Sequence, residues 1–351
     1  MCKVKVAIIG CGAISRFRHI PEYIQNKNVE IIAYCDTTIE RAEAYALEYG
    51  GRFYKDYKEM IDSEPSLQAV SVCTPNSTHA EMTIYALNRG IHVLCEKPMA
   101  ATVKEAQQMI EAAKSNNRIL MIGHNQRLMA PHVKVKELLV NGNLGKVLTF
   151  RTTFGHPGPE TWSVDGKESW FFRKEEAVMG ALGDLGVHKV DLIRWLLEEE
   201  IIEVSAMIDT LDKTFSNVED HANCLYKTES GVTGTMVASW IFKKGEDNST
   251  ILYCENGTIE VGTHQEYQVI VRLINGEIQK YQVGAIATND KGGQRDSRVI
   301  EEFIKSILNN MSPLITGEEG MKSLNVILHS IKAANEKRTV SILSPSNVTS
   351  K

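Results

Sequence analysis

The sequence lacks the cysteine spacing of a metal site or a redox pair, because none of its seven cysteines forms a C-x-x-C pattern. It also lacks the clustered Cys and His residues that hold structural zinc. Several cysteines lie inside or at the ends of aliphatic runs, which is typical of reduced, buried thiols in a cytoplasmic protein. We therefore expect no bound metal.

Long apolar runs and basic clusters are missing as well. No apolar run approaches the length of a membrane span, and the first residues enter a β-prone run with no signal sequence before it. The 39 Lys and Arg residues are outnumbered by 44 Asp and Glu residues, which gives a formal net charge of -5. These absences predict a cytoplasmic protein with neither a membrane nor a nucleic-acid partner. At 351 residues, the chain is long enough for two domains.

A glycine turn near the N-terminus is the first positive signal. The aliphatic run Val4–Ile9 stops at Gly10, Gly12 follows, and a helix-compatible run opens at Ala13. A continuous aliphatic run is typical of a parallel strand that is buried on both faces. The glycine turn after it lets the backbone approach a pyrophosphate at the start of the helix. Ser15 stands where a third glycine is common. A strand–helix turn without a ligand is the alternative interpretation.

An acidic residue follows the next predicted strand. Val29–Cys35 is β-prone and ends in Asp36, where a carboxylate can accept both ribose hydroxyls of NAD. Its charge disfavours the 2′-phosphate of NADP, although Arg41, one turn later, could compensate. NAD is therefore the expected cofactor. The expected contacts in this part of the chain are Gly10, Gly12, Ala13, Ile14, Asp36 and Arg41.

Strand and helix patterns alternate through residues 1–124. This alternation predicts a parallel sheet with helices on both faces, whose ligands lie at the carboxyl ends of the strands. Six strands are expected, at 4–9, 29–35, 52–54, 69–73, 91–95 and 118–122. The residues at their ends should line one crevice: Gly10, Asp36, Thr74, Glu96-Lys97-Pro98 and His124.

The pattern changes in residues 125–341. A helix at 131–141 and a strand at 146–154 precede a segment of about thirty residues that is rich in Gly, Pro and aromatics; loops of that length are usually functional or disordered. A helix at 187–197, seven short strands between 203 and 283, and helices at 297–309 and 317–335 follow. The last two helices could pack back on the first domain, and the tail after Ser341 should fray. The predicted fold class is an α/β Rossmann nucleotide-binding domain plus an α+β domain with a large, mostly antiparallel open sheet.

Four signatures together resemble the glucose–fructose oxidoreductase / inositol dehydrogenase family, also called Gfo/Idh/MocA, from about Val4 to Asn335. They are Gly10-Cys11-Gly12 with His19, Thr74-Pro75-Asn76 with His79, Cys95-Glu96-Lys97-Pro98, and the run from Gly180 to His188, GALGDLGVH. This chain departs from the family at Ser15 and at the interrupted glycine run. The resemblance implies a dimer or tetramer, and often a cis bond between Lys97 and Pro98.

The resemblance assigns catalysis to Lys97, Asp184 and His188. Oxidation of a secondary alcohol needs a proton acceptor and a charge that stabilises the alkoxide. Lys97 suits the second task and His188 the first, although either could take the proton or the two could form a relay. If a helix begins near Asp184, it shares a face with His188. Asp184 would then bind a substrate hydroxyl and hold His188 in the useful tautomer.

For most of the remaining candidates, the sequence allows more than one role. Thr74, Pro75 and Asn76 should face the ribose and nicotinamide of the cofactor, and His79 either joins them or caps the next helix. Glu96 should bond a ribose hydroxyl or orient Lys97. Arg127 contacts cofactor or substrate, or is structural. In the aromatic segment, the candidates for a sugar-binding wall are His156, Trp162 and Trp170, with a subunit contact or a small satellite core as the alternative.

These expectations describe an NAD-dependent dehydrogenase acting on the CH–OH group of a cyclic polyol or sugar, such as an inositol or a pyranoside. Two related activities would use the same site, namely reduction of a keto-sugar and redox-neutral glycoside cleavage with recycled NAD. A non-catalytic NAD(H) sensor is the alternative from another class. An intact set of Lys97, Asp184 and His188 disfavours it, because a sensor needs no proton acceptor.

Overall fold

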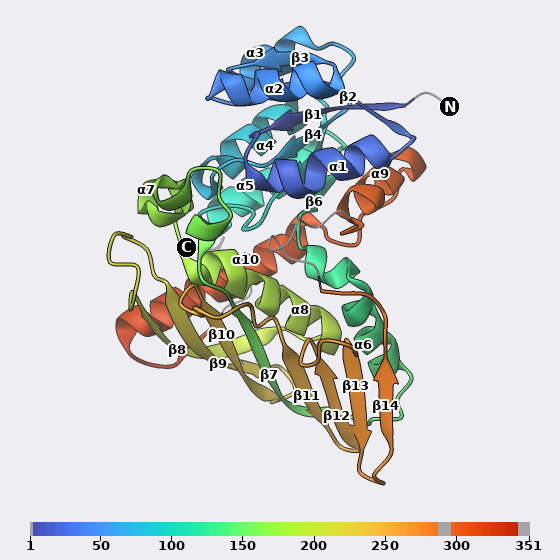
Figure 1. The fold of residues 1–351 in the computed structure, drawn as a ribbon, viewed down its shortest axis with the longest axis vertical. Helices are drawn as coiled ribbons and strands as arrows, with labels where there is room; N and C mark the ends of the chain where they lie inside the picture. The colour runs from blue at the N-terminus through green and yellow to red at the C-terminus, as the bar shows by residue number, and fades with distance from the viewer. Residues whose placement is uncertain (1–2, 287–295, 343–351) are drawn as a thin grey trace.

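The computed structural model describes residues 3–286 and 296–342, which form two sheets with helices packed against them (Figure 1). The first sheet has the order β3-β2-β1-β4-β5-β6 and all its neighbouring strands are parallel. Its strands are β1 (Val4–Ile9), β2 (Val29–Cys35), β3 (Arg52–Tyr54), β4 (Ala69–Val72), β5 (His92–Cys95) and β6 (Leu120–Ile122). The strand order reverses between β1 and β4, where ligands of such sheets bind.

Helices follow the strands of this sheet as predicted. They are α1 (Ile20–Gln25), α2 (Ile39–Tyr49), α3 (Tyr57–Ser63), α4 (His79–Asn88) and α5 (Val103–Ser115). The chain is helical from Ala13, but residues Ser15–His19 form a π-helical turn before α1. The hydroxyl of Thr102 accepts from the backbone of Glu105, whose carboxylate accepts from Thr102, so α5 begins with a capping box.

The second sheet has nine strands in the order β14-β13-β12-β11-β7-β10-β9-β8-β15. All of its neighbouring pairs are antiparallel except β7 and β10, so the expected mostly antiparallel sheet is confirmed. Its strands are β7 (Val147–Gly155), β8 (Ile201–Asp209), β9 (His221–Thr228), β10 (Thr233–Ser239), β11 (Thr250–Cys254), β12 (Gly257–Val261), β13 (Val269–Leu273), β14 (Ile278–Tyr281) and β15 (Val340–Ser341). The sequence patterns did not indicate β15, which is only two residues long.

Helices α6 (Ala130–Val140) and α8 (Val187–Leu197) pack on this second sheet (Figure 1). Two further helices end the described chain, α9 (Val299–Asn309) and α10 (Gly317–Glu336). Helix α10 contacts α5 and β6 of the first sheet as well as α8 and β8 of the second. The backbone N–H of Ser297, just before α9, donates to Glu22 of α1 at 2.8 Å. The C-terminal segment therefore also contacts the first domain. The predicted frayed tail after Ser341 falls almost wholly outside the described residues.

The aromatic segment between β7 and α8 is built from short turns of helix. These are 3₁₀ turns at Pro159–Thr161, Gly166–Glu168 and Trp170–Phe172, helix α7 (Lys174–Ala177), and a π-helical turn at Leu182–Gly186. Phe172 is buried, which anchors the segment against the rest of the domain. Figure 1 shows this segment, with α7, reaching up to the first sheet.

Six of the seven cysteines lie in the described part of the chain, and all six are buried free thiols, as predicted. In residues 3–286 and 296–342, no helix has the length and apolar character needed to cross a membrane. Across those residues, His, Cys, Asp and Glu side chains also form no group of three or more that could hold a metal ion.

Candidate active site

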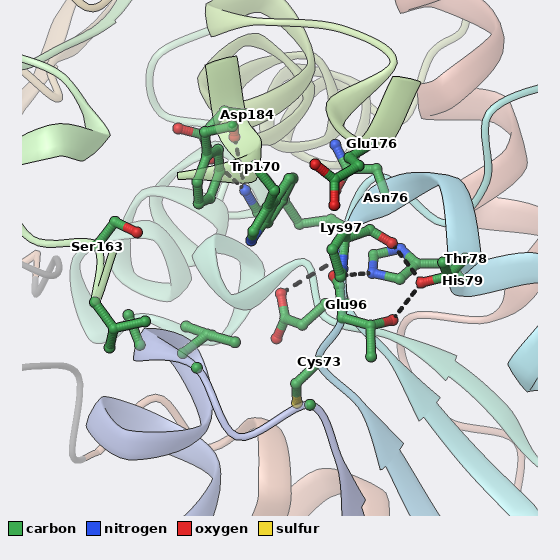
Figure 2. A pocket seen from close by; sticks show the side chains of 18 of the residues that line it. Cys73, Asn76, Thr78, His79, Glu96, Lys97, Ser163, Trp170, Glu176 and Asp184 are labelled. Atoms are coloured by element: carbon green, nitrogen blue, oxygen red, sulfur yellow. Dashed lines mark hydrogen bonds and ion pairs between the residues drawn. The ribbon is translucent and has the colours of Figure 1, made fainter. Parts of the chain in front are cut away.

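A cavity of about 670 Å³ lies between the strand ends of the first sheet and the aromatic segment of the second domain. That volume is within the usual range for ligand pockets, about 300–1,000 Å³. Figure 2 shows Lys97 and His79, from the first domain, on one side and Trp170 and Asp184 on the other. The cavity is lined by all but one of the predicted site residues: Gly10, Gly12, Ala13, Ile14, Asp36, Arg41, Thr74, Pro75, Asn76, His79, Glu96, Lys97, His156, Trp162, Trp170, Asp184 and His188.

The glycine turn after β1 has the shape that a pyrophosphate requires. Gly10 has a φ of +92°, and a Cβ added there would lie 2.5 Å from the carbonyl oxygen of Cys73. A Cβ added at Gly12 would meet nothing within 4 Å, so the space in front of this residue is open. The Ser15 hydroxyl donates to the carbonyl of Gly10 and thereby fixes the turn. These residues fit a dinucleotide whose phosphates meet the N-terminus of the helix that begins at Ala13.

Asp36 is held at the edge of the cavity by two backbone N–H groups. Its Oδ2 accepts from Cys11 and its Oδ1 from Thr38, both at 2.8 Å. These bonds fix the carboxylate where β2 ends. Because an ionised carboxylate has about four lone-pair sites, both oxygens can still accept from ribose hydroxyls. The position therefore fits the adenosine ribose of NAD.

Lys97 and Asp184 form an ion pair that spans the cavity. The Lys97 ammonium donates to Oδ1 of Asp184 at 2.7 Å and to its backbone carbonyl at 2.9 Å. The indole Nε1 of Trp240 donates to Oδ2 at 3.1 Å. Trp240 is fully buried just after β10 and was not among the residues predicted for the site. The peptide bond between Lys97 and Pro98 is cis, as the resemblance implied.

The part of the chain that the structure describes holds no hydrogen bond between Asp184 and His188, although both residues line the cavity. Asp184 lies in the π-helical turn that precedes α8, and its carboxylate pairs with Lys97 and Trp240 instead. Within the described residues, His188 Nδ1 is buried without a hydrogen-bond partner. The tautomer of His188 is therefore not set by Asp184.

His188 lies in a buried part of the cavity wall. Its ring centroid is 5.9 Å from that of Phe154 and 6.2 Å from that of His124. Burial and the neighbouring Lys97 charge lower the pKa of His188 well below its ordinary value, so the imidazole is neutral near pH 7. His124 was expected in the crevice, but it is not part of the cavity lining in the described structure.

Glu96 pairs with two side chains from the helix after the glycine turn. Its Oε1 contacts the guanidinium of Arg18 and lies 2.8 Å from Nε2 of His19. Burial alone would raise the pKa of Glu96, but the Arg18 charge and the His19 hydrogen bond hold it well below its usual range. Arg18 lines the cavity and was missed by sequence reasoning, because a single arginine inside a predicted helix carries no motif.

His79 connects the two strand-end loops of the first sheet. Its Nδ1 lies 2.8 Å from the carbonyl oxygen of Pro98 and its Nε2 2.9 Å from that of Thr74. Asn76 donates from Nδ2 to the carbonyl of Ala177 at 2.7 Å, which ties the first loop to α7. His79 is thus a positioning residue that also lines the cavity.

Arg127 is the one predicted site residue that the structure does not bring to the cavity. Its guanidinium donates to Asp191 at 2.6 and 2.7 Å and to Glu319 of α10 at 2.8 Å. The side chain is 3% exposed and is not part of the cavity lining. A buried charge requires such partners, so the basic residue after β6 anchors α8 and α10.

Aromatic rings continue the cavity wall away from the cofactor side. The ring centroids of His156 and Trp162 are 6.4 Å apart, and those of Trp162 and Phe171 are 5.1 Å apart. Trp170 stacks on Phe171 at 3.9 Å. These rings come from one contiguous segment, and His156, Trp162, Trp170 and Phe171 all line the cavity.

Comparison with known proteins agrees with this geometry. Residues 4–124 match the oxidoreductase family with an NAD-binding Rossmann fold, and residues 132–260 match the GFO/IDH/MocA C-terminal domain. The chain belongs to the Gfo/Idh/MocA family. The two matched domains contain the four motifs that carried the resemblance in the sequence. The chain is an NAD-dependent oxidoreductase of the class that acts on CH–OH donors.

Relatives within the Gfo/Idh/MocA family act on several substrates. The 1,5-anhydro-D-fructose reductase of Ensifer adhaerens is 28% identical over 93% of this chain and 95% of its own length. The glucose-6-phosphate 3-dehydrogenase of Bacillus subtilis is 30% identical over 67% of each chain. The aldose-aldose oxidoreductase of Caulobacter crescentus, solved with glycerol, is 29% identical with a TM-score of 0.83, covering 97% of this chain and 99% of that one.

Proposed function

We propose that this protein transfers a hydride between NAD and a ring secondary alcohol of a cyclic polyol or sugar, with Lys97, Asp184 and His188 as its catalytic residues. Bound NAD supplies the nicotinamide carbon that exchanges the hydride. The observation that carries the proposal is that a lysine ammonium and a neutral histidine line one cavity. The same cavity is lined by the glycine turn after β1 and by the aromatic rings of Trp162, Trp170 and Phe171.

We assign the proton of the reacting hydroxyl to His188. A neutral imidazole can accept a proton, whereas Nζ of Lys97 is already engaged as a hydrogen-bond donor to Asp184. Lys97 then stabilises the developing alkoxide by its charge. Asp184 holds the ammonium in place and can accept from a neighbouring substrate hydroxyl.

The cofactor-binding residues divide by position along the cavity. Asp36 would bind the adenosine ribose, and the turn from Gly10 to Ile14 the pyrophosphate. The end of β4, with Thr74, Pro75 and Asn76, and Glu96 after β5 would border the nicotinamide half. Two interactions support this order: the Cys11 N–H bond to Asp36 and the His79 bridge between the strand-end loops.

The charges in the cavity favour an unphosphorylated ring as the substrate. Four of the cationic side chains in its lining have carboxylate partners: Arg18 with Glu96, Arg41 with Asp165, Lys97 with Asp184, and Arg173 with Glu176. At each of these four positions, a phosphate on the substrate would need to displace a carboxylate. The C–H faces of a pyranose or inositol ring suit the aromatic wall formed by Trp162, Trp170 and Phe171.

The proposal is tested by following nicotinamide absorbance with NAD⁺ and a panel of inositols, free pyranoses, methyl glycosides and a sugar phosphate. We expect NADH to form with a neutral pyranoside or inositol, and to form far more slowly with His188→Gln or Lys97→Met. Binding of NAD⁺ without turnover in either direction, with any member of the panel or its keto form, would refute the proposal.

Reduction of a keto-sugar is the second candidate, because the Ensifer adhaerens relative that aligns over most of both chains is a reductase. The same residues serve this direction: Lys97 would polarise the carbonyl and stabilise the alkoxide formed by hydride transfer, and His188 would relay the proton that this alkoxide takes up. Oxidation of NADH with 1,5-anhydro-fructose or a 3-keto-glucoside, with little NAD⁺ reduction by the parent alcohols, would identify it.

A further inference from the structure

Arg41 and Asp165 form an ion pair at the adenosine end of the cavity. Nη2 of Arg41, in the first turn of α2, donates to Oδ1 of Asp165 at 2.5 Å across 124 residues of sequence. Their side chains are 32% and 35% exposed, and both residues line the cavity. At this contact the aromatic segment of the second domain meets the Rossmann domain.

Arg41 lies close to the carboxylate that would hold the adenosine ribose. The backbone N–H of Arg41 donates to the carbonyl of Thr38 at 2.9 Å, and the N–H of Thr38 donates to Oδ1 of Asp36 at 2.8 Å. Burial raises the pKa of the Cys11 thiol, the nearby Asp36 charge raises it further, and the nearby Arg41 charge lowers it. The acid and the base are therefore neighbours at the end of β2.

We propose that Asp165 is a cofactor-specificity residue, which disfavours NADP by holding Arg41 in an ion pair. The inference rests on the Rossmann cleft being the cofactor site, as in the proposed function. It concerns cofactor binding alone and does not depend on which sugar is oxidised.

The physical reason is the charge of the 2′-phosphate that distinguishes NADP from NAD. A phosphate monoester carries about −1.5 to −2 charges near neutral pH and is best matched by the planar fork of a guanidinium. Beside Asp36, that phosphate would need a compensating cation. Arg41 is in position to supply it, but Asp165 already neutralises its charge, so a 2′-phosphate that binds Arg41 must break the ion pair.

Other charged groups near the adenosine end define the controls. Lys55 and Asp56 follow β3 and are exposed, and Glu168 lies in the same segment as Asp165; all three line the cavity. The described structure gives Glu168 no ion pair, although its carboxylate carries the same charge as that of Asp165. A Glu168→Gln variant therefore removes an equal charge from this segment without releasing Arg41.

The experiment measures the Kd of NADH and NADPH by calorimetry, in the absence of any sugar. The variants are Asp165→Asn, Arg41→Ala, the double variant and Glu168→Gln. Because a half-exposed ion pair contributes up to about 1 kcal/mol, Asp165→Asn should tighten NADPH binding about fivefold and change NADH binding little. In the Arg41→Ala background the same substitution should have no such effect, because no guanidinium is left to release.

Three results would overturn the inference. The first is an unchanged ratio of the two Kd values in Asp165→Asn. The second is an equal gain in the Arg41→Ala background or in Glu168→Gln, because each would indicate a general field effect. The third is loss of NADH binding in folded Asp165→Asn, which would make the contact a support for the loop. Failure of the wild-type protein to bind either cofactor would instead refute the cofactor site itself.

Discussion

Nζ of Lys97 lies 2.7 Å from Oδ1 of Asp184, although 87 residues separate them in the sequence. Lys97 follows β5 of the first sheet, and Asp184 precedes α8 on the second. The ion pair therefore joins the two domains at the place where cofactor and substrate would meet. Trp240 holds the other oxygen of the same carboxylate, so the position of the ammonium depends on three separate parts of the chain.

Removing the Lys97 ammonium should abolish most of the activity. We expect Lys97→Met to lower kcat about 10²–10³-fold, since electrostatic stabilisation of developing charge by one such group commonly supplies that much. Steady-state kinetics with the best substrate of the panel would measure this, with NADH affinity determined separately. Lys104→Met, on the exposed face of α5, is the matched control and should be neutral. Retained activity in Lys97→Met would contradict the assignment.

Trp240 should act as a positioning residue for Asp184. Trp240→Phe removes the indole N–H but keeps an aromatic ring near Phe171 and Phe172. Because a hydrogen bond to a charged group contributes about 1.5–3 kcal/mol, we expect kcat to fall about tenfold or more with unchanged NADH affinity. Trp195→Phe, on α8, controls for loss of an indole elsewhere. A fall in thermal stability without any change in kcat would assign Trp240 a purely structural role.

Arg127 should matter for stability and not for cofactor binding. Arg127→Met leaves Asp191 buried without its main partner, and breaking a buried pair in this way costs about 3–5 kcal/mol of unfolding free energy. Urea unfolding measures this cost, and calorimetry on the folded fraction should give a wild-type Kd for NADH. The exposed pair of Arg89 with Asp62 is the comparison, since its loss should cost at most about 1 kcal/mol. A selective loss of NADH affinity in Arg127→Met would restore the original assignment of this residue.

Four buried histidines should make the protein lose stability on mild acidification. Burial is the first cause that lowers the pKa of His79, His124, His132 and His188, and the value for His124 falls to about 4. An unfolded histidine binds a proton below about pH 6.5, whereas in the folded protein the lowered pKa of these side chains moves protonation to lower pH. The unfolded state thus takes up more protons as the pH falls, and the unfolding free energy decreases by up to about 1.4 kcal/mol per pH unit for each histidine.

Urea unfolding at pH 7.5, 6.5 and 5.5 would show this slope. In His132→Gln, the unfolding free energy should change less with pH, by the contribution of one histidine. The His132 imidazole is fully buried and its pKa is lowered to about 3. Stability that stays constant from pH 7.5 to 5.5 would show that these imidazoles are protonated in the folded protein as well.

Short-range patterns predicted much of this protein. The aliphatic run before Gly10, the acid after β2 and the strand–helix alternation indicate the Rossmann domain, because each depends on local spacing. The run around Lys97 and the run ending at His188 indicated the site through a resemblance, and both line the cavity. Their roles in catalysis stay predictions.

Contacts between distant segments could not be predicted in the same way. Trp240 reaches Asp184 across 56 residues, and Asp165 reaches Arg41 across 124, with no periodicity connecting either pair. The described residues hold no hydrogen bond between Asp184 and His188, because the Asp184 carboxylate pairs with Lys97 and Trp240, which lie far from it in the sequence. Arg127 was predicted at the site because it follows a strand end, but its guanidinium forms a buried ion pair with the carboxylate of Asp191.

The central claim, that a ring hydrogen moves as hydride to NAD, is tested most directly by following that hydrogen. The protein is incubated with NAD⁺ and a methyl glucoside or inositol that is deuterated at its ring carbons, and the cofactor is analysed by mass spectrometry. We predict NADH that carries the deuterium, formed much more slowly by His188→Gln at equal cofactor occupancy. If NAD⁺ binds but never acquires deuterium from any member of the panel, and deuterated NADH never donates it to a keto-sugar, the account is wrong.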